Sequence, residues 1–272
     1  MLENYREKYP DGIINLHRQV FVYALTNLTA LVSQADESEG VDMEDTGTAR
    51  KQVAQIPSGS IILEGELIVP VGASGVVLFA HGSGSSRHSP RNQFVARVIR
   101  EANVGTLLFD LLTKEEEAID IYTRHLRFDI GLLADRLVDA TNWIKSESGT
   151  RHLRVGYFGS STGGGAALVA AARIAEEIGA VVSRGGRPDL AGEALALVKS
   201  PTLLIVGGYD EPVIELNEKA YAQLRCEKEL KIVPGATHLF EEPGTLEEVA
   251  SLAAEWFQRH LQSRSSVNTT RR

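Results

Sequence analysis

The chain has 272 residues, of which 43% are hydrophobic and 24% charged, values that are ordinary for a folded globular protein. That length is enough for one large domain with a well-buried core and a short extension. The formal net charge of −8, with no lysine- and arginine-rich block before the last residues, argues against nucleic-acid binding, and the single cysteine, Cys226, excludes a disulfide framework within the chain.

The first 50 residues differ in character from the rest of the chain. Residues 11–34 carry apolar side chains at helical spacing and predict an amphipathic helix, and the acidic residues 36–45 indicate a linker. We expect residues 1–50 to form a helical extension packed on the main domain or on a second copy of it, with a lid over the active site as the alternative. No apolar leader and no membrane-spanning run is visible, so we expect a cytoplasmic protein without membrane contact.

Residues 51–264 are expected to form one α/β domain, followed by a flexible tail at 265–272. Short apolar runs predict strands at residues 61–69, 76–80, 106–110, 153–158, 180–183, 202–206 and 230–233. Amphipathic spacing predicts helices at residues 90–102, 130–144, 162–178 and 246–261. The charged stretch 113–127 is expected to be a loop. This alternation predicts a mostly parallel central sheet with helices on both faces.

The segment around Ser161 carries the strongest local signal. Gly159, Ser161 and Gly163 form a G-x-S-x-G pattern between a predicted strand and an alanine-rich predicted helix. A serine held in a strained turn needs small neighbours, because the backbone passes close to itself there. Chance can supply the three positions, but their place between strand and helix predicts a nucleophile elbow with Ser161 as the nucleophile.

A serine hydroxyl needs a base to take its proton and a third group to orient that base. Asp210 follows a predicted strand 49 residues after Ser161, and His238 follows the last predicted strand 28 residues later. Serine, acid and histidine occur in this order in hydrolases built on such sheets. We therefore predict His238 as the general base and Asp210 as the residue that orients it, with Glu211 as the alternative acid.

A second glycine-rich loop, His-Gly-Ser-Gly at residues 81–84, directly follows a predicted central strand. A tetrahedral intermediate needs N–H donors aimed at its oxyanion, and this loop and the residue after the nucleophile are the usual sources. The predicted oxyanion donors are therefore the amides of Ser83 and Thr162. The alternative, a phosphate-cradling loop of a dinucleotide fold, lacks the G-x-G-x-x-G spacing, so we expect no cofactor and no metal.

Arginines flank the predicted site loops at Arg87, Arg91, Arg184 and Arg187. Arg87 and Arg184 are candidates for binding an anionic substrate through bidentate contacts, and the alternative is that such arginines pair with structural carboxylates such as Asp189. The acidic run at residues 115–117 is expected to be a solvated face, with a place at the border of the pocket as the alternative.

The loop at residues 81–84, the elbow around Ser161, Asp210 and His238 together resemble the α/β-hydrolase superfamily, and the short chain is most similar to its dienelactone hydrolase-like group. The resemblance covers roughly residues 57–262 and implies the α/β-hydrolase fold. Residues 81–92 and 183–189 are similar to bacterial hydrolases sometimes joined to a phosphoribosyltransferase domain. Dienelactone hydrolases use a cysteine nucleophile, whereas position 161 is serine, which favours a serine esterase.

We therefore expect a serine hydrolase that cleaves carboxylic esters of small substrates through an acyl-enzyme, as a monomer or homodimer. Thioesterase, lactonase and peptidase activities are alternatives on the same fold, because the three residues do not separate them. A non-catalytic ligand-binding module is the alternative from a different class, and it gains weight if the Ser161 and His238 side chains are out of hydrogen-bond reach.

Overall fold

The computed structural model describes residues 44–45 and 49–262. Contacts divide the chain into two compact units, Met1–Val41 and Asp42–Arg272, and every described residue lies in the second unit. The helix predicted at residues 11–34 and the tail predicted at 265–272 lie outside the described residues.

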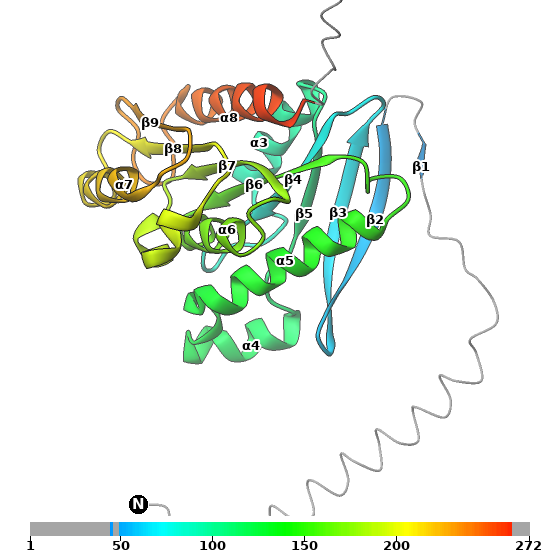
Figure 1. The fold of residues 1–272 in the computed structure, drawn as a ribbon. Helices are drawn as coiled ribbons and strands as arrows, with labels where there is room; N and C mark the ends of the chain where they lie inside the picture. The colour runs from blue at the N-terminus through cyan, green and yellow to red at the C-terminus, as the bar shows by residue number, and fades with distance from the viewer. Residues whose placement is uncertain (1–43, 46–48, 263–272) are drawn as a thin grey trace, which may run out of the picture. The chain divides into compact units, whose positions relative to one another are not determined.

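One sheet runs through the described part of the chain, in the strand order β1-β2-β3-β5-β4-β6-β7-β8-β9 (Figure 1). Its strands are β1 (Glu44–Asp45), β2 (Ala49–Ser58), β3 (Ile61–Pro70), β4 (Gly75–Ala80), β5 (Gly105–Phe109), β6 (Arg154–Ser160), β7 (Ile178–Arg184), β8 (Thr202–Gly207) and β9 (Lys228–Val233). The strands from β5 to β9 in this order pair in parallel, whereas β1, β2 and β3 are antiparallel at one edge.

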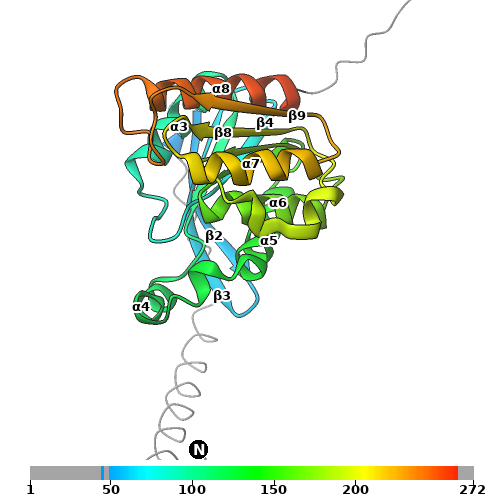
Figure 2. The same cartoon turned by 90° about the vertical axis from the view of Figure 1, so that its left-hand side faces the viewer.

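Helices cover both faces of the sheet, as Figures 1 and 2 show. On one face, α3 (Pro90–Glu101) and α8 (Thr245–Leu261) contact each other and share a buried cluster with the strands. On the other face, the second cluster includes α5 (Ile130–Ser146), α6 (Thr162–Arg173) and α7 (Glu211–Gln223). Strands β4, β5, β7 and β8 are buried along their whole length because both of their faces are covered, which is why their sequences are mostly apolar. The predicted fold class is confirmed.

The antiparallel edge differs from expectation, since no strand is predicted before residue 61. β2 pairs with β3 along its full length. Only alternate residues of β2 are buried and one of them is Gln52, whereas Val53 is 62% exposed, so the apolar alternation that predicts a strand is weak. The sheet therefore begins ahead of the predicted domain start at residue 51.

The charged stretch predicted as a loop contains a helix, α4 (Lys114–Thr123). The Thr113 hydroxyl accepts a hydrogen bond from the Glu116 amide, and the Glu116 carboxylate accepts one from the Thr113 amide, which forms a capping box. The fully buried Asp120 accepts the amide of Leu126 beyond the end of the helix. The T-x-x-E pattern at residues 113–116 was the sequence signal for this helix start.

Two further connections differ in detail. α6 ends at Arg173, well before its predicted end, and the 3-10 helices η1 (Leu126–Phe128) and η2 (Pro188–Leu197) form parts of other loops. α7 occupies the connection between β8 and β9 and ends at Gln223. None of the helices within residues 49–262 combines the length and the apolar character that crossing a bilayer requires.

Parallel pairing determines where the site lies. The carboxyl ends of β4, β6, β7, β8 and β9 meet at one edge of the sheet, because their neighbours run in the same direction. The loops that leave these ends begin at His81, Ser161, Gly185, Gly208 and Pro234. This edge is where open α/β sheets bind their ligands.

Candidate active site

Ser161 joins β6 to α6 in a strained turn, with φ 51° and ψ −123°. Residues other than glycine rarely adopt a positive φ, and this strain is what a nucleophile elbow imposes. A Cβ added to Gly163 would lie 2.1 Å from the carbonyl oxygen of Ala80, and one added to Gly159 would lie 2.5 Å from that of Gly163. Close backbone approach therefore requires glycine on both sides of the serine, as the sequence pattern predicts.

The backbone of Ser161 is tied to the loop after β7. Its amide donates to the carbonyl of Arg184 at 3.3 Å, and its carbonyl accepts the amides of Gly164 at 3.0 Å and Arg187 at 2.9 Å. These bonds hold the elbow between two neighbouring strands. Residues from β6 and β7 are thereby fixed relative to each other at the site.

The structure joins the predicted acid and base. His238 Nδ1 lies 2.6 Å from Asp210 Oδ2, and the two side chains are 38% and 13% exposed. A Cβ on Gly185 would lie 3.5 Å from two atoms of the His238 ring, so the ring packs directly on this glycine. The Asp210 carboxylate contacts Nδ1, so Nε2 is the ring nitrogen that does not contact this acid.

Ser161 and His238 line the same cavity, of about 640 Å³. Within residues 49–262 the Ser161 hydroxyl makes no hydrogen bond, so the Ser161–His238 contact that base catalysis needs is not formed in this structure. Catalytic hydrogen bonds are often long in enzymes without substrate and shorten when substrate binds. The three predicted residues thus lie at one site. The His238–Asp210 contact is formed there, and the Ser161–His238 contact is not.

The predicted oxyanion donors lie side by side. The Ser83 amide donates to the Thr162 hydroxyl at 2.9 Å, so it is already paired with a side chain. Thr162 opens α6, and its own amide makes no hydrogen bond among the described residues. The sequence analysis missed the role of the Thr162 hydroxyl, although a threonine directly after the nucleophile was the available signal.

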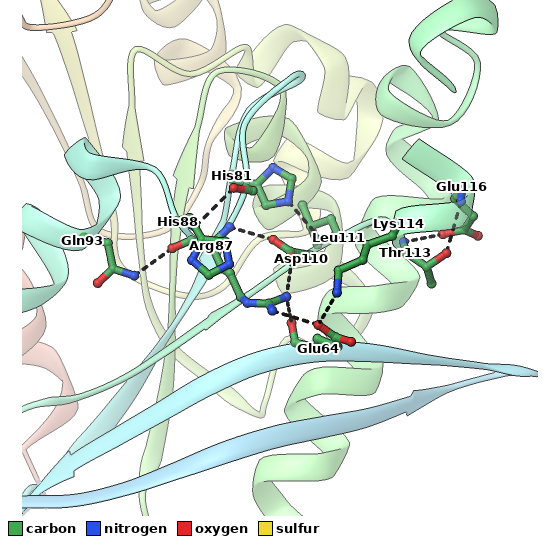
Figure 3. A network of polar contacts seen from close by, with 11 residues as sticks. Glu64, His81, Arg87, His88, Gln93, Asp110, Leu111, Thr113, Lys114 and Glu116 are labelled. Atoms are coloured by element: carbon green, nitrogen blue, oxygen red, sulfur yellow. Dashed lines mark hydrogen bonds and ion pairs between the residues drawn. The ribbon is translucent and has the colours of Figure 1, made fainter. Parts of the chain in front are cut away.

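Arg87 lies in a polar network outside the Ser161 cavity (Figure 3). Its guanidinium contacts the carboxylates of Asp110 and Glu64, the latter at 2.8 Å, and its amide donates to Asp110 at 2.7 Å. The hydrogen bond from Arg87 and the charge of Lys114 lower the pKa of the Glu64 carboxyl. Arg87 therefore sits in the alternative arrangement considered for it, pairing with structural carboxylates.

His81, at the start of the same loop, links two strand ends (Figure 3). Its Nε2 accepts the amide of Leu111 at 3.0 Å, and its Nδ1 lies 3.0 Å from the carbonyl oxygen of Gly82. Because Nε2 accepts, the proton of the neutral ring is on Nδ1 and is donated to Gly82. Burial lowers the pKa of His81, which favours this neutral form.

The other arginines divide into paired and unpaired groups. Arg187 forms a bidentate pair with Asp189 at 2.7 and 2.8 Å, as the structural alternative predicts. Arg91 reaches the Ser161 cavity but pairs with Glu241 at 3.0 Å. Arg184 lines the cavity, is only 7% exposed, and has no ion-pair partner among the described residues.

The rest of the cavity wall is polar and built from small residues. Beside Ser161, His238, Arg91 and Arg184 it includes Gly82, Ser83, Gly84, Ser85, Ser86, His88, Ser89, Pro90, Glu117, Ser160 and Leu239. Glu117 is the member of the acidic run that reaches the cavity, and it does so because α4 is a helix. Within residues 49–262 no group of three His, Cys, Asp or Glu side chains is arranged to hold a metal ion.

A strained serine after a central strand, with an acid–histidine pair on later strand ends, defines an α/β-hydrolase fold. The model of the dienelactone hydrolase family matches residues 96–263, and the chain belongs to this family. Family membership indicates a hydrolase.

Similar proteins agree with this assignment. A dienelactone hydrolase of known structure from Anabaena variabilis is 62% identical, with a TM-score of 0.78 over 79% of this chain and 100% of that one. Est1E from Butyrivibrio proteoclasticus is 16% identical with a TM-score of 0.63 over 76% of this chain and 98% of its own, a likeness of fold.

Curated relatives are longer than this chain. Two Mycobacterium tuberculosis proteins, named as candidate phosphoribosyl transferases, are 55% identical over 225 residues, which are 83% of this chain and 50% of theirs. The chain thus spans about half the length of the curated relatives it matches.

Proposed function

We propose that this α/β-hydrolase domain cleaves carboxylic esters of small substrates through an acyl-enzyme on Ser161. The observation that carries the proposal is the His238–Asp210 hydrogen bond of 2.6 Å at the cavity that also holds the strained Ser161. The proposal concerns this domain alone, because the chain spans half of its curated relatives.

In the proposed reaction, His238 Nε2 takes the Ser161 hydroxyl proton as Oγ bonds to the ester carbon. The tetrahedral intermediate then breaks its bond to the alcohol oxygen, which leaves with the proton from His238. Water attacks the acyl-enzyme, His238 takes the proton of the water, and the carboxylic acid departs as Ser161 regains its hydrogen. Asp210 stays ionised and holds Nδ1–H throughout, which stabilises the imidazolium.

The proposed oxyanion donors act differently. The Thr162 amide is unpaired within the described residues and can donate directly. The Ser83 amide must exchange its present acceptor, the Thr162 hydroxyl, for the oxyanion. The Ser83 amide would therefore stabilise the transition state and not the bound substrate. A contact made only in the transition state raises kcat rather than binding affinity.

The test is Ser161→Ala against 4-nitrophenyl acetate and butyrate, with the adjacent Ser160→Ala as the matched control. We expect Ser161→Ala to lower kcat by more than about 10⁴-fold, and a fluorophosphonate probe to label the wild type and Ser160→Ala but not Ser161→Ala. Undiminished turnover by Ser161→Ala contradicts the proposal. A folded wild type that hydrolyses no ester and takes no label favours the non-catalytic module.

The same assay separates the alternatives on this fold. Matched acetyl thioester, lactone and peptide substrates are compared with the oxygen ester at equal concentration. The proposal expects the oxygen ester to have the highest kcat/KM. If kcat/KM is higher for the thioester, lactone or peptide, that activity is assigned in place of ester hydrolysis. The proposed roles of Ser161 and His238 then stay the same.

A further inference from the structure

Arg184 is a buried cation that has no ion-pair partner among residues 49–262. The residue is 7% exposed, and its Nε and Nη1 atoms are inaccessible to solvent and make no hydrogen bond. Arg87, Arg91 and Arg187 each pair with at least one carboxylate. Arg184 therefore differs from these neighbours in lacking an anion.

The surroundings of Arg184 make this charge costly. Its guanidinium lies 5.9 Å from the centre of the Phe240 ring, and the charged group that affects its pKa is another cation, Arg91. Burial, with the charge of Arg91, lowers the pKa of Arg184 to about 10, which still leaves it charged at neutral pH. Glu117 lines the same cavity but forms no ion pair with Arg184 among the described residues.

The wall around Arg184 offers donors for an anion. Serine hydroxyls line the cavity at Ser83, Ser85, Ser86 and Ser89, and α3 begins beside them with Ser89 as its N-cap. Arg91, in the first turn of α3, supplies a second positive charge, which its ion pair with Glu241 offsets in part. Two cations and several hydroxyls match a dianion with three terminal oxygens better than a carboxylate, which one guanidinium satisfies with two parallel bonds.

We propose that Arg184 binds a phosphate group of the substrate, so that the ester cleaved at Ser161 carries a phosphate on its alcohol part. The inference rests on the proposed ester hydrolysis and adds the substrate class. Arg184 is the last residue of β7, and its carbonyl accepts the Ser161 amide. The backbone thus fixes the anion-binding residue relative to the nucleophile, so the charged group positions the scissile bond.

The test compares three acetyl esters of the same length: 3-acetoxypropyl phosphate, 3-acetoxypropanol and 4-acetoxybutyrate, with acetate release followed by titration. We expect the wild type to prefer the phosphate ester over the neutral one in kcat/KM by roughly 10- to 100-fold. In Arg184→Gln this ratio falls toward one, and in Arg184→Lys it falls in part, because the ammonium lacks the planar fork. Arg187→Gln, whose side chain pairs with Asp189 outside the cavity, keeps the ratio.

Three outcomes overturn the inference. The first is a wild type with no preference for the phosphate ester over the neutral one. The second is a preference for the carboxylate ester over the phosphate ester. The third is an equal loss on charged and neutral esters in both Arg184 variants, which assigns Arg184 a structural role.

A binding measurement keeps this result separate from the proposed function. Inorganic phosphate should raise the Tm of the wild type and of Ser161→Ala, and should not raise that of Arg184→Gln. If no ester is hydrolysed but the phosphate shift depends on Arg184, the hydrolase proposal fails and the anion site stands. If esters are hydrolysed without a phosphate preference or shift, the anion site fails and the hydrolase proposal stands.

Discussion

His238 and Asp210 lie 28 residues apart in the chain, and their Nδ1 and Oδ2 atoms are 2.6 Å apart in the structure. Each residue follows the carboxyl end of its own strand, β9 and β8, and these strands are parallel neighbours. The pair is therefore a consequence of strand order. In the proposed mechanism this pair holds one tautomer of the imidazole at the Ser161 cavity.

Asp210→Asn should lower kcat for a neutral ester by roughly 10⁴-fold, because an amide fails to stabilise the imidazolium and allows the wrong tautomer. The measurement is steady-state kinetics together with circular dichroism. Glu211→Gln, at the adjacent position, should leave the rate near that of the wild type. Full activity in Asp210→Asn with loss in Glu211→Gln would assign the acid to Glu211.

Gly163→Ala should destabilise the domain by at least about 2–3 kcal/mol. The added Cβ would lie 2.1 Å from the carbonyl oxygen of Ala80, and a backbone atom has little room to move. Gly131→Ala is the matched control, because its nearest neighbour is 3.3 Å away, and its helical position predicts a change within about 1 kcal/mol, toward greater stability. Urea unfolding measures both variants, and equal midpoints would refute the close-approach argument.

Thr162→Val should lower kcat by less than the roughly 10²-fold cost of deleting an oxyanion donor, because the Ser83 amide remains but loses the acceptor that positions it before the oxyanion forms. The valine keeps the volume of threonine but removes the acceptor that holds the Ser83 amide at 2.9 Å. Thr162→Ser restores an acceptor and should recover most of the rate. The measurement is kcat at saturating ester, together with the Tm of each variant. A purely structural effect would lower the Tm of Thr162→Val, and Thr162→Ser would not recover kcat.

Arg87→Gln should destabilise the domain by about 1–2 kcal/mol, because it leaves the partly buried Asp110 with one hydrogen-bond donor fewer. It should not change the ratio of kcat/KM between the phosphate and neutral esters, since Arg87 does not line the Ser161 cavity. Thermal unfolding and the three-ester comparison test both statements. Loss of the phosphate preference in Arg87→Gln, with an unchanged Tm, would instead assign Arg87 to substrate binding.

Replacement of His81 should change how stability depends on pH. Burial lowers the folded-state pKa of His81 below 6.5, so between the two pKa values the unfolded chain binds a proton that the folded chain does not. The stability from His81 is thus fully present above 6.5 and declines as pH falls toward the folded value. The difference in unfolding free energy between wild type and His81→Gln should narrow from about pH 8 to about pH 5.5. A difference independent of pH would contradict the neutral, buried ring.

The elements that sequence predicts best are those buried on both faces. β4, β5 and β8 consist mostly of apolar residues, so the sequence predicted them without knowledge of their neighbours. The strand β2 was not predicted because it lies near the edge of the sheet and only alternate residues are buried. One of these buried residues is the polar Gln52, which weakens the apolar pattern. The helix α4 was not predicted because its many charged residues suggested a loop. The signal for the helix was its capping box, which rests on only two side chains.

The sequence by itself determined the α/β architecture, the family, and the order of Ser161, Asp210 and His238 on strand ends, because apolar runs and glycine spacing are local properties of the chain. Only the tertiary structure distinguished Arg87 from Arg184 and paired the Ser83 amide with the Thr162 hydroxyl across 79 residues. Those outcomes depend on which carboxylate or hydroxyl another strand brings within hydrogen-bond reach. Such long-range pairing has no period in the sequence from which it can be predicted.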